Sequence, residues 1–143
     1  MNTPIQKLVT GLLAAFKAKD LDATLAYFAD DAVFIDPHYP NPQLVGKQAI
    51  ADGFTWTFAT LEKLNFAILN FYTTPDEQNV AVEVATAHVF PGGKAVQFTQ
   101  TFIVETRNGQ VVRLQSYTPY GPNGLGGLFL QIMRLRMRLT NKG

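Results

Sequence analysis

Three polar side chains in a largely apolar sequence have the chemistry to move a proton. Asp36 follows the run Ala-Val-Phe-Ile and precedes a proline, His38 comes two residues later, and His88 lies near the end of a β-branched stretch. A carboxylate buried among aromatic residues becomes a better base, because burial disfavours its charged form. A histidine can serve as acid, base or hydrogen-bond donor. Asp36 and His88 are therefore the candidate catalytic residues, with Asp36 as the base and His88 as the donor.

Each of these residues also has a structural interpretation, and the sequence leaves both open. Asp-Pro is typical of turns, in which the carboxylate accepts backbone N–H groups. Asp36 is thus either a turn residue that ends a strand or a base at the mouth of an apolar cavity. His38, in the proline-rich segment 37–42, is a loop residue or part of the rim of that mouth. His88 is a pocket residue or a partly exposed residue near a hairpin end.

The composition restricts the class of protein. The 143 residues fit one domain, 1–143, and 47% hydrophobic against 16% charged residues predicts a globular chain. A net charge of +1 gives no broad field for nucleic acid, and we expect no nucleic-acid partner. With no cysteine and two histidines, we expect no metal site and no cofactor. The first residues lack a signal-peptide pattern and no run of 18 residues is apolar, so we expect a cytoplasmic protein.

Helices are predicted in the first half of the chain. The sequence Thr3-Pro4-Ile5-Gln6 is a capping signature, and the apolar periodicity that follows predicts a helix to about Lys19. Asp20 can cap a short second helix, whose inner face would be Leu21, Leu25 and Phe28. A third helix begins at Lys47 with an apolar stripe, although Gly53 weakens it by about 1 kcal/mol relative to alanine.

Extended segments follow from residue 61 onward. The stretches 61–74, 79–90, 94–106 and 110–120 are rich in β-branched and aromatic residues and are separated by turn sequences. Helices followed by a three- or four-strand meander predict an α+β fold, with helices on one face of an antiparallel sheet. The segment 124–139 predicts one more helix, in which Arg134, Arg136 and Arg138 alternate with apolar residues. That helix either caps the pocket or packs on a neighbour, or else binds an anionic membrane surface.

The alternation along three strands predicts a concave apolar wall. Its faces match only if the turns at 91–93 and 107–109 are three-residue or bulged, because a two-residue turn would exchange the faces. The wall would carry a few polar points among apolar side chains. Its predicted inward-facing residues include Val84, Thr86, His88, Phe98, Gln100, Phe102, Val112, Leu114, Ser116 and Thr118.

Nearly the whole chain resembles the nuclear transport factor 2-like superfamily, in particular its ketosteroid isomerase and SnoaL-like polyketide cyclase branch. The resemblance is carried by DLDATLAYFADDAVFIDP (20–37), GKQAI (46–50), GGKAVQFTQTFIVETRNGQVVRLQSY (92–117) and LGGLFLQ (125–131). It implies a cone-shaped fold, in which three N-terminal helices pack on a curved antiparallel sheet around a pocket. It also implies a homodimer through the outer face of the sheet, and places the isomerase's general base on Asp36.

The sequence departs from the isomerase pattern at the oxyanion donors. The residues that stand at those positions are Leu12, Phe54 and either Phe102 or Thr101. One such donor typically contributes about 3 kcal/mol of transition-state stabilisation, so steroid isomerisation by that mechanism is disfavoured. The arrangement of an epoxide hydrolase is rejected as well, because Arg113 should face outward.

The predicted function is that of a pocket protein for a small hydrophobic ligand with a carbonyl or hydroxyl. The reaction, if there is one, would be cofactor-free proton transfer of the isomerase, cyclase or dehydratase type. The alternative is a noncatalytic ligand-binding or protein-association domain. Trp56 would line the pocket mouth or a subunit contact. The predicted ligand-binding residues are Phe16, Phe28, His38, Phe54, Trp56, Val84, Thr86, Phe98, Gln100, Phe102, Leu114, Ser116 and Thr118.

Overall fold

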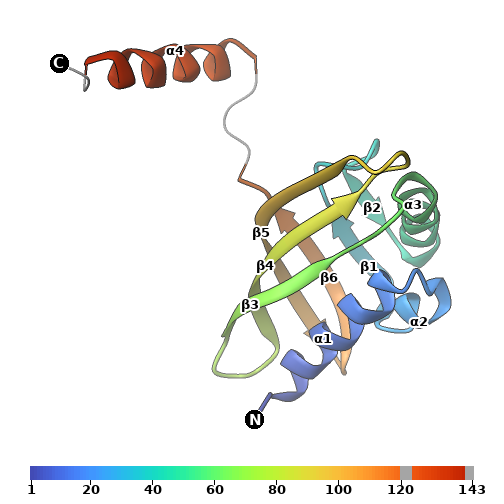
Figure 1. Ribbon diagram of the computed structural model, residues 1–143. Coiled ribbons are helices and arrows are strands. Elements are labelled where there is room, and N and C mark those ends of the chain that lie inside the picture. Colours follow the sequence, from blue (N-terminus) through green and yellow to red (C-terminus); the bar gives the residue numbers. More distant parts are fainter. Residues whose placement is uncertain (120–123, 141–143) are drawn as a thin grey trace.

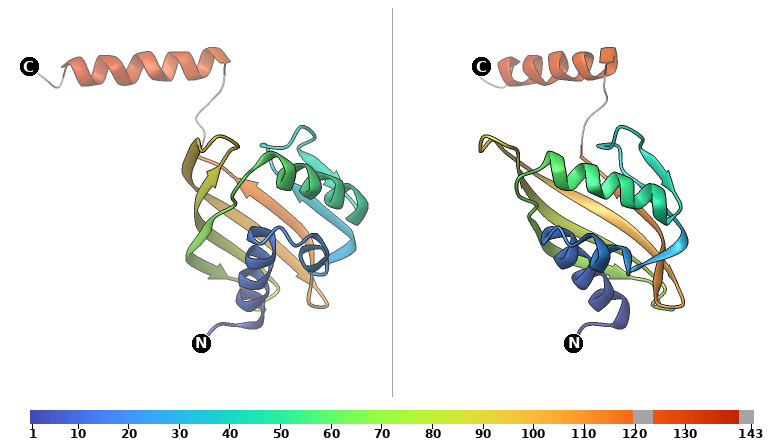
Figure 2. Two further views of the ribbon diagram at one scale, coloured as in Figure 1. Left: turned by 45° about the vertical axis from the view of Figure 1, so that its right-hand side comes forward. Right: turned by 90° about the vertical axis from the view of Figure 1, so that its right-hand side faces the viewer.

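A six-stranded sheet organises the chain, and three helices cover one of its faces (Figures 1 and 2). The computed structural model describes residues 1–119 and 124–140. Its elements in chain order are α1 (Pro4–Lys17), α2 (Leu21–Leu25), β1 (Phe28–Ile35), β2 (Gln43–Val45), α3 (Lys47–Thr60), β3 (Phe66–Thr73), β4 (Asn79–Val89), β5 (Ala95–Arg107), β6 (Gln110–Tyr117) and α4 (Gly124–Thr140). The predicted α+β class and its cone-like layering are confirmed.

The strand order is β2-β1-β6-β5-β4-β3. Strands β3 to β6 form the predicted antiparallel meander. Strand β1 joins β6 in parallel, and β2 pairs antiparallel with β1 at the sheet edge. Strand β2 was not predicted, because three residues after a proline-rich loop are too few to show alternation.

The predicted starts of the helices in the N-terminal half are confirmed. The Thr3 side chain accepts the Gln6 N–H while the Gln6 side chain accepts the Thr3 N–H, which completes the capping box. Helix α1 ends at Lys17 rather than near Lys19, because Lys19 takes a left-handed conformation with φ 56°. The Asp20 carboxylate accepts the Ala23 N–H at 3.0 Å and so caps α2 as expected.

Phe28 was assigned to the wrong element. Helix α2 ends at Leu25, and Phe28 begins β1, where it pairs with Val111 of β6 and is fully buried. Its spacing from Leu25 is also that of a helix face, so periodicity alone could not separate the two assignments.

The predicted turns supply the register that the apolar faces require. The Phe90 N–H donates to the Lys94 carbonyl at 2.8 Å across the three-residue loop 91–93, and the Gly93 N–H donates to the Phe90 carbonyl at 3.0 Å. The turn between β5 and β6 is tight, with Asn108 and Gly109 both at positive φ, and a bulge lies beside it at Glu105/Thr106. Because of that bulge, Val111 is the buried residue, and the prediction that Val112 faces inward is wrong.

Close packing against α3 explains the glycine at position 53. A Cβ atom at this position would lie 2.4 Å from Leu44 Cδ1 and 3.3 Å from Tyr39 Cε2. The glycine therefore lets β2 and the loop before it approach the helix closely, which offsets the expected loss of helix propensity.

The far edge of the sheet is irregular. Strand β3 is the edge strand, and its register with β4 shifts between Ile68 and Asn70, so that Leu69 is exposed. The Asn70 side-chain oxygen accepts the Phe71 N–H at 3.1 Å. One backbone donor of this edge is therefore occupied by a side chain.

Helix α4 stands apart from the sheet and the other helices (Figures 1 and 2). Its large apolar side chains are exposed, including those of Phe129 and Leu139. Over residues 1–119 and 124–140, no helix combines the length and apolar character needed to cross a membrane.

Candidate functional site

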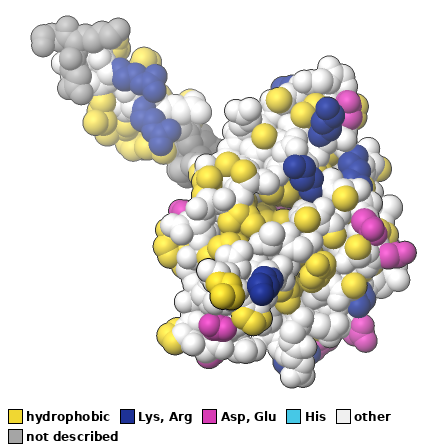
Figure 3. All heavy atoms as spheres, turned by 60° about the horizontal axis from the view of Figure 1, so that its bottom comes forward, with side chains coloured by type: hydrophobic (Ala, Val, Ile, Leu, Met, Phe, Trp, Pro, Cys, Tyr) yellow, Lys and Arg dark blue, Asp and Glu magenta, His cyan; other side chains and the backbone are white. Residues whose placement is uncertain are grey.

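A cavity of about 390 Å³ lies between the helices and the concave face of the sheet. Its volume is in the range of small-molecule sites, and most of its wall is apolar. Hydrophobic side chains also gather over the middle of the face seen in Figure 3. Of the residues predicted for the site, the cavity wall includes Phe16, Asp36, His38, Phe54, Trp56, His88, Phe98, Gln100, Phe102 and Leu114.

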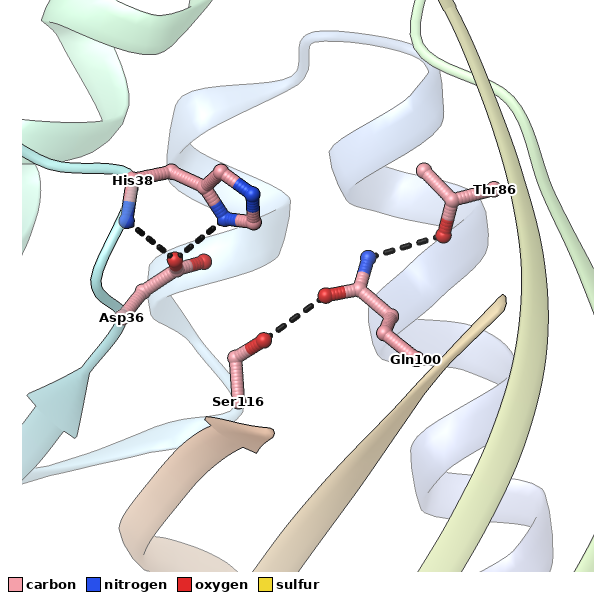
Figure 4. A network of polar contacts seen from close by, with 5 residues as sticks. All are labelled: Asp36, His38, Thr86, Gln100 and Ser116. Carbon is pink, nitrogen blue, oxygen red and sulfur yellow. Dashed lines mark hydrogen bonds and ion pairs between the residues drawn. The ribbon is translucent and has the colours of Figure 1, made fainter. Parts of the chain in front are cut away.

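One polar group of the cavity comes from the loop after β1. Asp36 Oδ1 accepts the His38 N–H at 2.9 Å and contacts His38 Nδ1 at 2.7 Å (Figure 4). An ionised carboxylate only accepts hydrogen bonds, so Nδ1 carries a proton and the basic lone pair of the neutral ring lies on Nε2. The side chain of Asp36 is buried at the cavity wall. Asp36 thus forms the turn and faces the cavity at once, so the two interpretations of this residue are compatible.

The same loop holds a buried tyrosine that was not among the predicted ligand-binding residues. Tyr39 packs against Phe34 and Trp56, with ring centroids 5.1 and 5.5 Å away. Burial, helped by the charge of Asp36, raises the pKa of Tyr39 against the opposing effect of a hydrogen bond with Thr57, so the phenol remains neutral. The signal was present, because an aromatic residue inside a proline-rich loop needs a packing partner.

His88 faces the cavity from the sheet side. The Asn65 N–H donates to His88 Nδ1 at 3.3 Å, which leaves the ring proton on Nε2. Burial and the neighbouring His38 lower the pKa of His88 to about 4, against an opposing effect of Asp36. At neutral pH this histidine is therefore an uncharged ring with an Nε2–H donor.

Three buried polar residues of the sheet form a chain of hydrogen bonds. Gln100 Nε2 donates to Thr86 Oγ1 at 2.8 Å, and Ser116 Oγ donates to Gln100 Oε1 at 2.7 Å (Figure 4). Gln100 lies on the cavity wall, whereas Thr86 and Ser116 are not part of it. The two hydroxyls hold the amide in place, and the amide keeps one further N–H for a ligand.

Phe98 connects the two histidines across the cavity. Its ring centroid is 5.4 Å from that of His38 and 6.4 Å from that of His88. The structure thus brings together three groups that are far apart in the sequence: a carboxylate–histidine pair, a neutral histidine and an anchored amide. Between them the cavity offers a base on one side and hydrogen-bond donors on the other.

The remaining predicted residues lie elsewhere. Phe28 and Val84 are fully buried in the core, away from the cavity wall. Thr118 lies beyond the end of β6 and is half-buried. The cavity wall also includes Val96, which shares a strand face with Phe98 and Gln100. Its other residues were not predicted by the strand alternation, since they come from helix faces, loops and strand ends: Leu12, Leu13, Phe34, Tyr39, Thr57, Thr60, Leu61, Phe66 and Phe90.

The positions implied for oxyanion donors are apolar. Leu12, Phe54 and Phe102 all line the cavity, and none has a polar side-chain atom to offer. Arg113 pairs with Glu105 at 2.9 Å and is not part of the cavity wall. In the described ranges, no three acidic or histidine side chains are arranged to hold a metal ion.

Comparisons with known proteins agree with this architecture. The sequence model of the SnoaL-like domain family matches residues 9–114. A search of curated proteins finds no match. Several solved structures share the fold at low sequence identity.

Three of these structures illustrate the range of proteins that share this fold. A Catenulispora acidiphila protein with a ketosteroid isomerase-like fold, in complex with trimethylamine, is 22% identical, with a TM-score of 0.68 over 77% of this chain and 83% of its own. A Mycobacterium tuberculosis protein in complex with estradiol-17beta-hemisuccinate is 19% identical, with a TM-score of 0.72 over 81% and 94%. The Delta 5-3-ketosteroid isomerase of a Mycobacterium species is 18% identical, with a TM-score of 0.72 over 81% and 93%.

Proposed function

This chain belongs to the SnoaL-like domain family of the nuclear transport factor 2-like superfamily, and from that membership we propose that it binds a small hydrophobic carbonyl compound and transfers a proton on it. The observation that carries the proposal is the contact of 2.7 Å between Asp36 Oδ1 and His38 Nδ1 at the wall of an apolar cavity. No cofactor enters the proposal, because a base and hydrogen-bond donors suffice for this chemistry.

The proposed reaction begins with removal of a proton from the carbon next to the carbonyl. His38 Nε2 takes the proton, the electrons of the C–H bond move toward the carbonyl oxygen, and Asp36 stabilises the imidazolium that forms. The His88 Nε2–H, with the free N–H of Gln100, is the donor for the developing enolate oxygen. Return of the proton to another atom completes an isomerisation, a cyclisation or a dehydration.

The apolar wall supports a hydrophobic ligand. The rings of Phe16, Phe54, Phe66 and Phe98 leave little on that wall to replace the hydration of a charged molecule. Structural neighbours crystallised with a steroid ester or with polyporic acid show that this fold accommodates such ligands in other proteins.

A noncatalytic binding domain is the second candidate. It is favoured by the apolar residues Leu12, Phe54 and Phe102 at the positions where the isomerase pattern has donors. In that case the polar groups would only orient the bound ligand. The two candidates differ in one measurable property, which is the exchange of the ligand's α-protons.

The experiment measures that exchange directly. The purified protein is first screened by thermal shift against hydrophobic cyclic ketones and enones. Any compound that binds is then incubated in D₂O, and deuterium uptake at its α-carbon is followed by NMR. We expect uptake above the uncatalysed rate, reduced about 100-fold or more in Asp36→Asn and in His38→Gln.

A matched control tests whether the loss of an unrelated carboxylate affects deuterium uptake. Asp52→Asn removes an exposed carboxylate of α3 that contacts only Gln48 among its described hydrogen-bond partners, and it should leave uptake unchanged. Binding without uptake in the wild type would reject proton transfer and leave the binding domain. No binding by any of these ligands would reject both.

Two expectations from the resemblance belong to the same proposal. A homodimer through the outer face of the sheet would place Glu83, Thr101 and Gln115 at a close polar contact. Sedimentation velocity on the wild type and on Thr101→Arg tests it, since a large charged side chain should dissociate such a dimer. A cytoplasmic location is tested by cell fractionation.

A further inference from the structure

Helix α4 exposes most of its apolar surface. Seven large apolar side chains between Leu128 and Leu139 are each 41–66% exposed. None of the described residues of α4 belongs to the cavity wall, so the helix does not cap the pocket in this structure. An apolar surface of this length on a soluble domain marks a site of interaction.

The charges of α4 all have one sign. Arg134, Arg136 and Arg138 are its only charged residues, and the segment Gly124–Thr140 contains no Asp or Glu. Figure 3 shows their blue side chains beside yellow apolar ones on this helix. A partner for α4 therefore has to accept apolar side chains and supply negative charge at the same place.

The two kinds of side chain are partly segregated around the helix. At 100° per residue, Arg134 and Arg138 fall near Gln131, on the side opposite Phe129 and Ile132. Arg136 falls within the apolar arc near the C-terminal end, where a long side chain can extend its charge to the polar layer. This is the pattern of a helix that lies in a membrane interface.

Helix α4 does not combine the length and the apolar character of a membrane span. Seventeen residues rise about 25 Å as a helix, and three arginines inside that length are costly in hydrocarbon. A helix lying parallel to the surface buries its apolar side chains and keeps its arginines among the headgroups.

We propose that α4 binds the surface of an anionic phospholipid membrane and tethers the domain to it. Lys and Arg number 12 in the chain, of which three are in α4 and one is Lys142, so eight remain against 11 acidic residues before α4. The rest of the chain is therefore acidic and is repelled by such a surface. The attraction is confined to α4, and the domain is held away from the lipid.

This tether has a consequence that rests on the proposed function. A hydrophobic ligand is concentrated in the lipid phase, and a domain fixed at the surface would meet it there. The binding of α4 to lipid does not depend on that function, so the two proposals can fail separately.

The test is co-sedimentation of the full-length protein with vesicles. The vesicles are phosphatidylcholine alone or phosphatidylcholine mixed with phosphatidylglycerol, each at low and at high salt. We expect binding to the anionic vesicles, weaker binding at high salt, and a loss of at least tenfold in the triple variant Arg134→Gln, Arg136→Gln, Arg138→Gln. Phe129→Ser with Ile132→Ser should weaken binding at either salt concentration.

The control variant removes the same charge from the domain. Lys7, Lys17 and Lys94 are exposed, and their joint replacement by Gln should leave vesicle binding unchanged or stronger. The proposal is overturned if no vesicle binds, or if the α4 variants bind as the wild type does. It is also overturned if those variants change the sedimentation of the protein without lipid, because α4 would then pack on a second copy or on its own domain. Deuterium uptake by a bound ketone, measured without lipid, reports on the proposed function alone.

Discussion

The domain of residues 1–119 and helix α4 are both rich in large apolar side chains, yet they use them in opposite ways. In the domain, Phe28, Ile50 and Phe54 are almost completely buried. In α4, Phe129 and Leu139 are 65% and 66% exposed. The apolar side chains of the domain thus pack on the chain itself, whereas those of α4, by our proposal, contact a lipid surface. The comparison shows that an apolar pattern predicts burial but does not say what buries it.

Matched phenylalanine substitutions give the largest expected difference between the two regions. The ring centroid of Phe54 lies within 5.6 Å of those of Phe16, Phe28 and Phe34. Phe54→Ala should therefore lower the free energy of unfolding by about 3–5 kcal/mol. Phe129→Ala should change it by less than about 0.5 kcal/mol. Urea denaturation measures both. An equal loss in the two variants would mean that α4 packs on the domain in solution.

Gly53 and an exposed position of α4 give a second, smaller contrast. Gly53→Ala gains helix propensity but forces Leu44 and Tyr39 to move, so we expect the variant to be about 1 kcal/mol less stable. Gln131→Ala in α4 should leave the free energy of unfolding unchanged. If Gly53→Ala is instead more stable than the wild type, β2 can shift away from the helix without a loss of stability.

The pH dependence of stability should belong to the domain alone. The pKa of His88 is about 4 in the folded protein and near 6.5 in the unfolded chain. Between these pH values the unfolded chain binds the proton and the folded protein does not, so stability falls as the pH decreases from 6.5 toward 4. The melting temperature should therefore drop less between pH 7 and pH 4.5 in His88→Gln than in the wild type.

The control for that measurement is Arg134→Gln. Arginine stays protonated over this pH range, so the drop in melting temperature should match that of the wild type. If His88→Gln shows the full drop, another group of the domain carries the pH dependence.

Removal of the C-terminal segment should have the smallest effect on folding. A chain ending at Pro119 lacks α4 but keeps every described residue of the cavity wall. We expect its melting temperature to lie within about 2 °C of the full-length value, while its vesicle binding is lost. A large decrease in melting temperature would contradict the independence of the two regions.

Much of the fold could be predicted because several local signals agreed. The capping box at Thr3, the cap at Asp20 and the strand alternation around Gln100 each pointed to the element that the structure contains. Phe28 and Val112 were misplaced for different physical reasons. A helix and a strand can both bury a residue at the position of Phe28, and the bulge beside the turn between β5 and β6 moved Val112 off the inner face.

The site was less predictable than the fold. Asp36, His88 and Gln100 were named from their types and faces, and the structure puts all three at the cavity, although their roles remain predictions. The contact between Asp36 and His38 could not be derived, because it depends on the conformation of one proline-rich loop. Tyr39 and Phe66 were not among the predicted ligand-binding residues for a related reason, since loops and strand ends have no apolar periodicity.

The irregular edge of the sheet has a consequence for how this protein behaves at high concentration. A straight edge strand offers a row of free N–H and C=O groups to another chain and is a common start for aggregation. In β3 the bulge at Leu69 breaks that row, and the Asn70 side chain occupies the Phe71 N–H. Strand β2, at the opposite edge, is only three residues long. Although the sheet is open at both ends, neither edge is a good template for a further strand. This disfavours aggregation through the edges of the sheet.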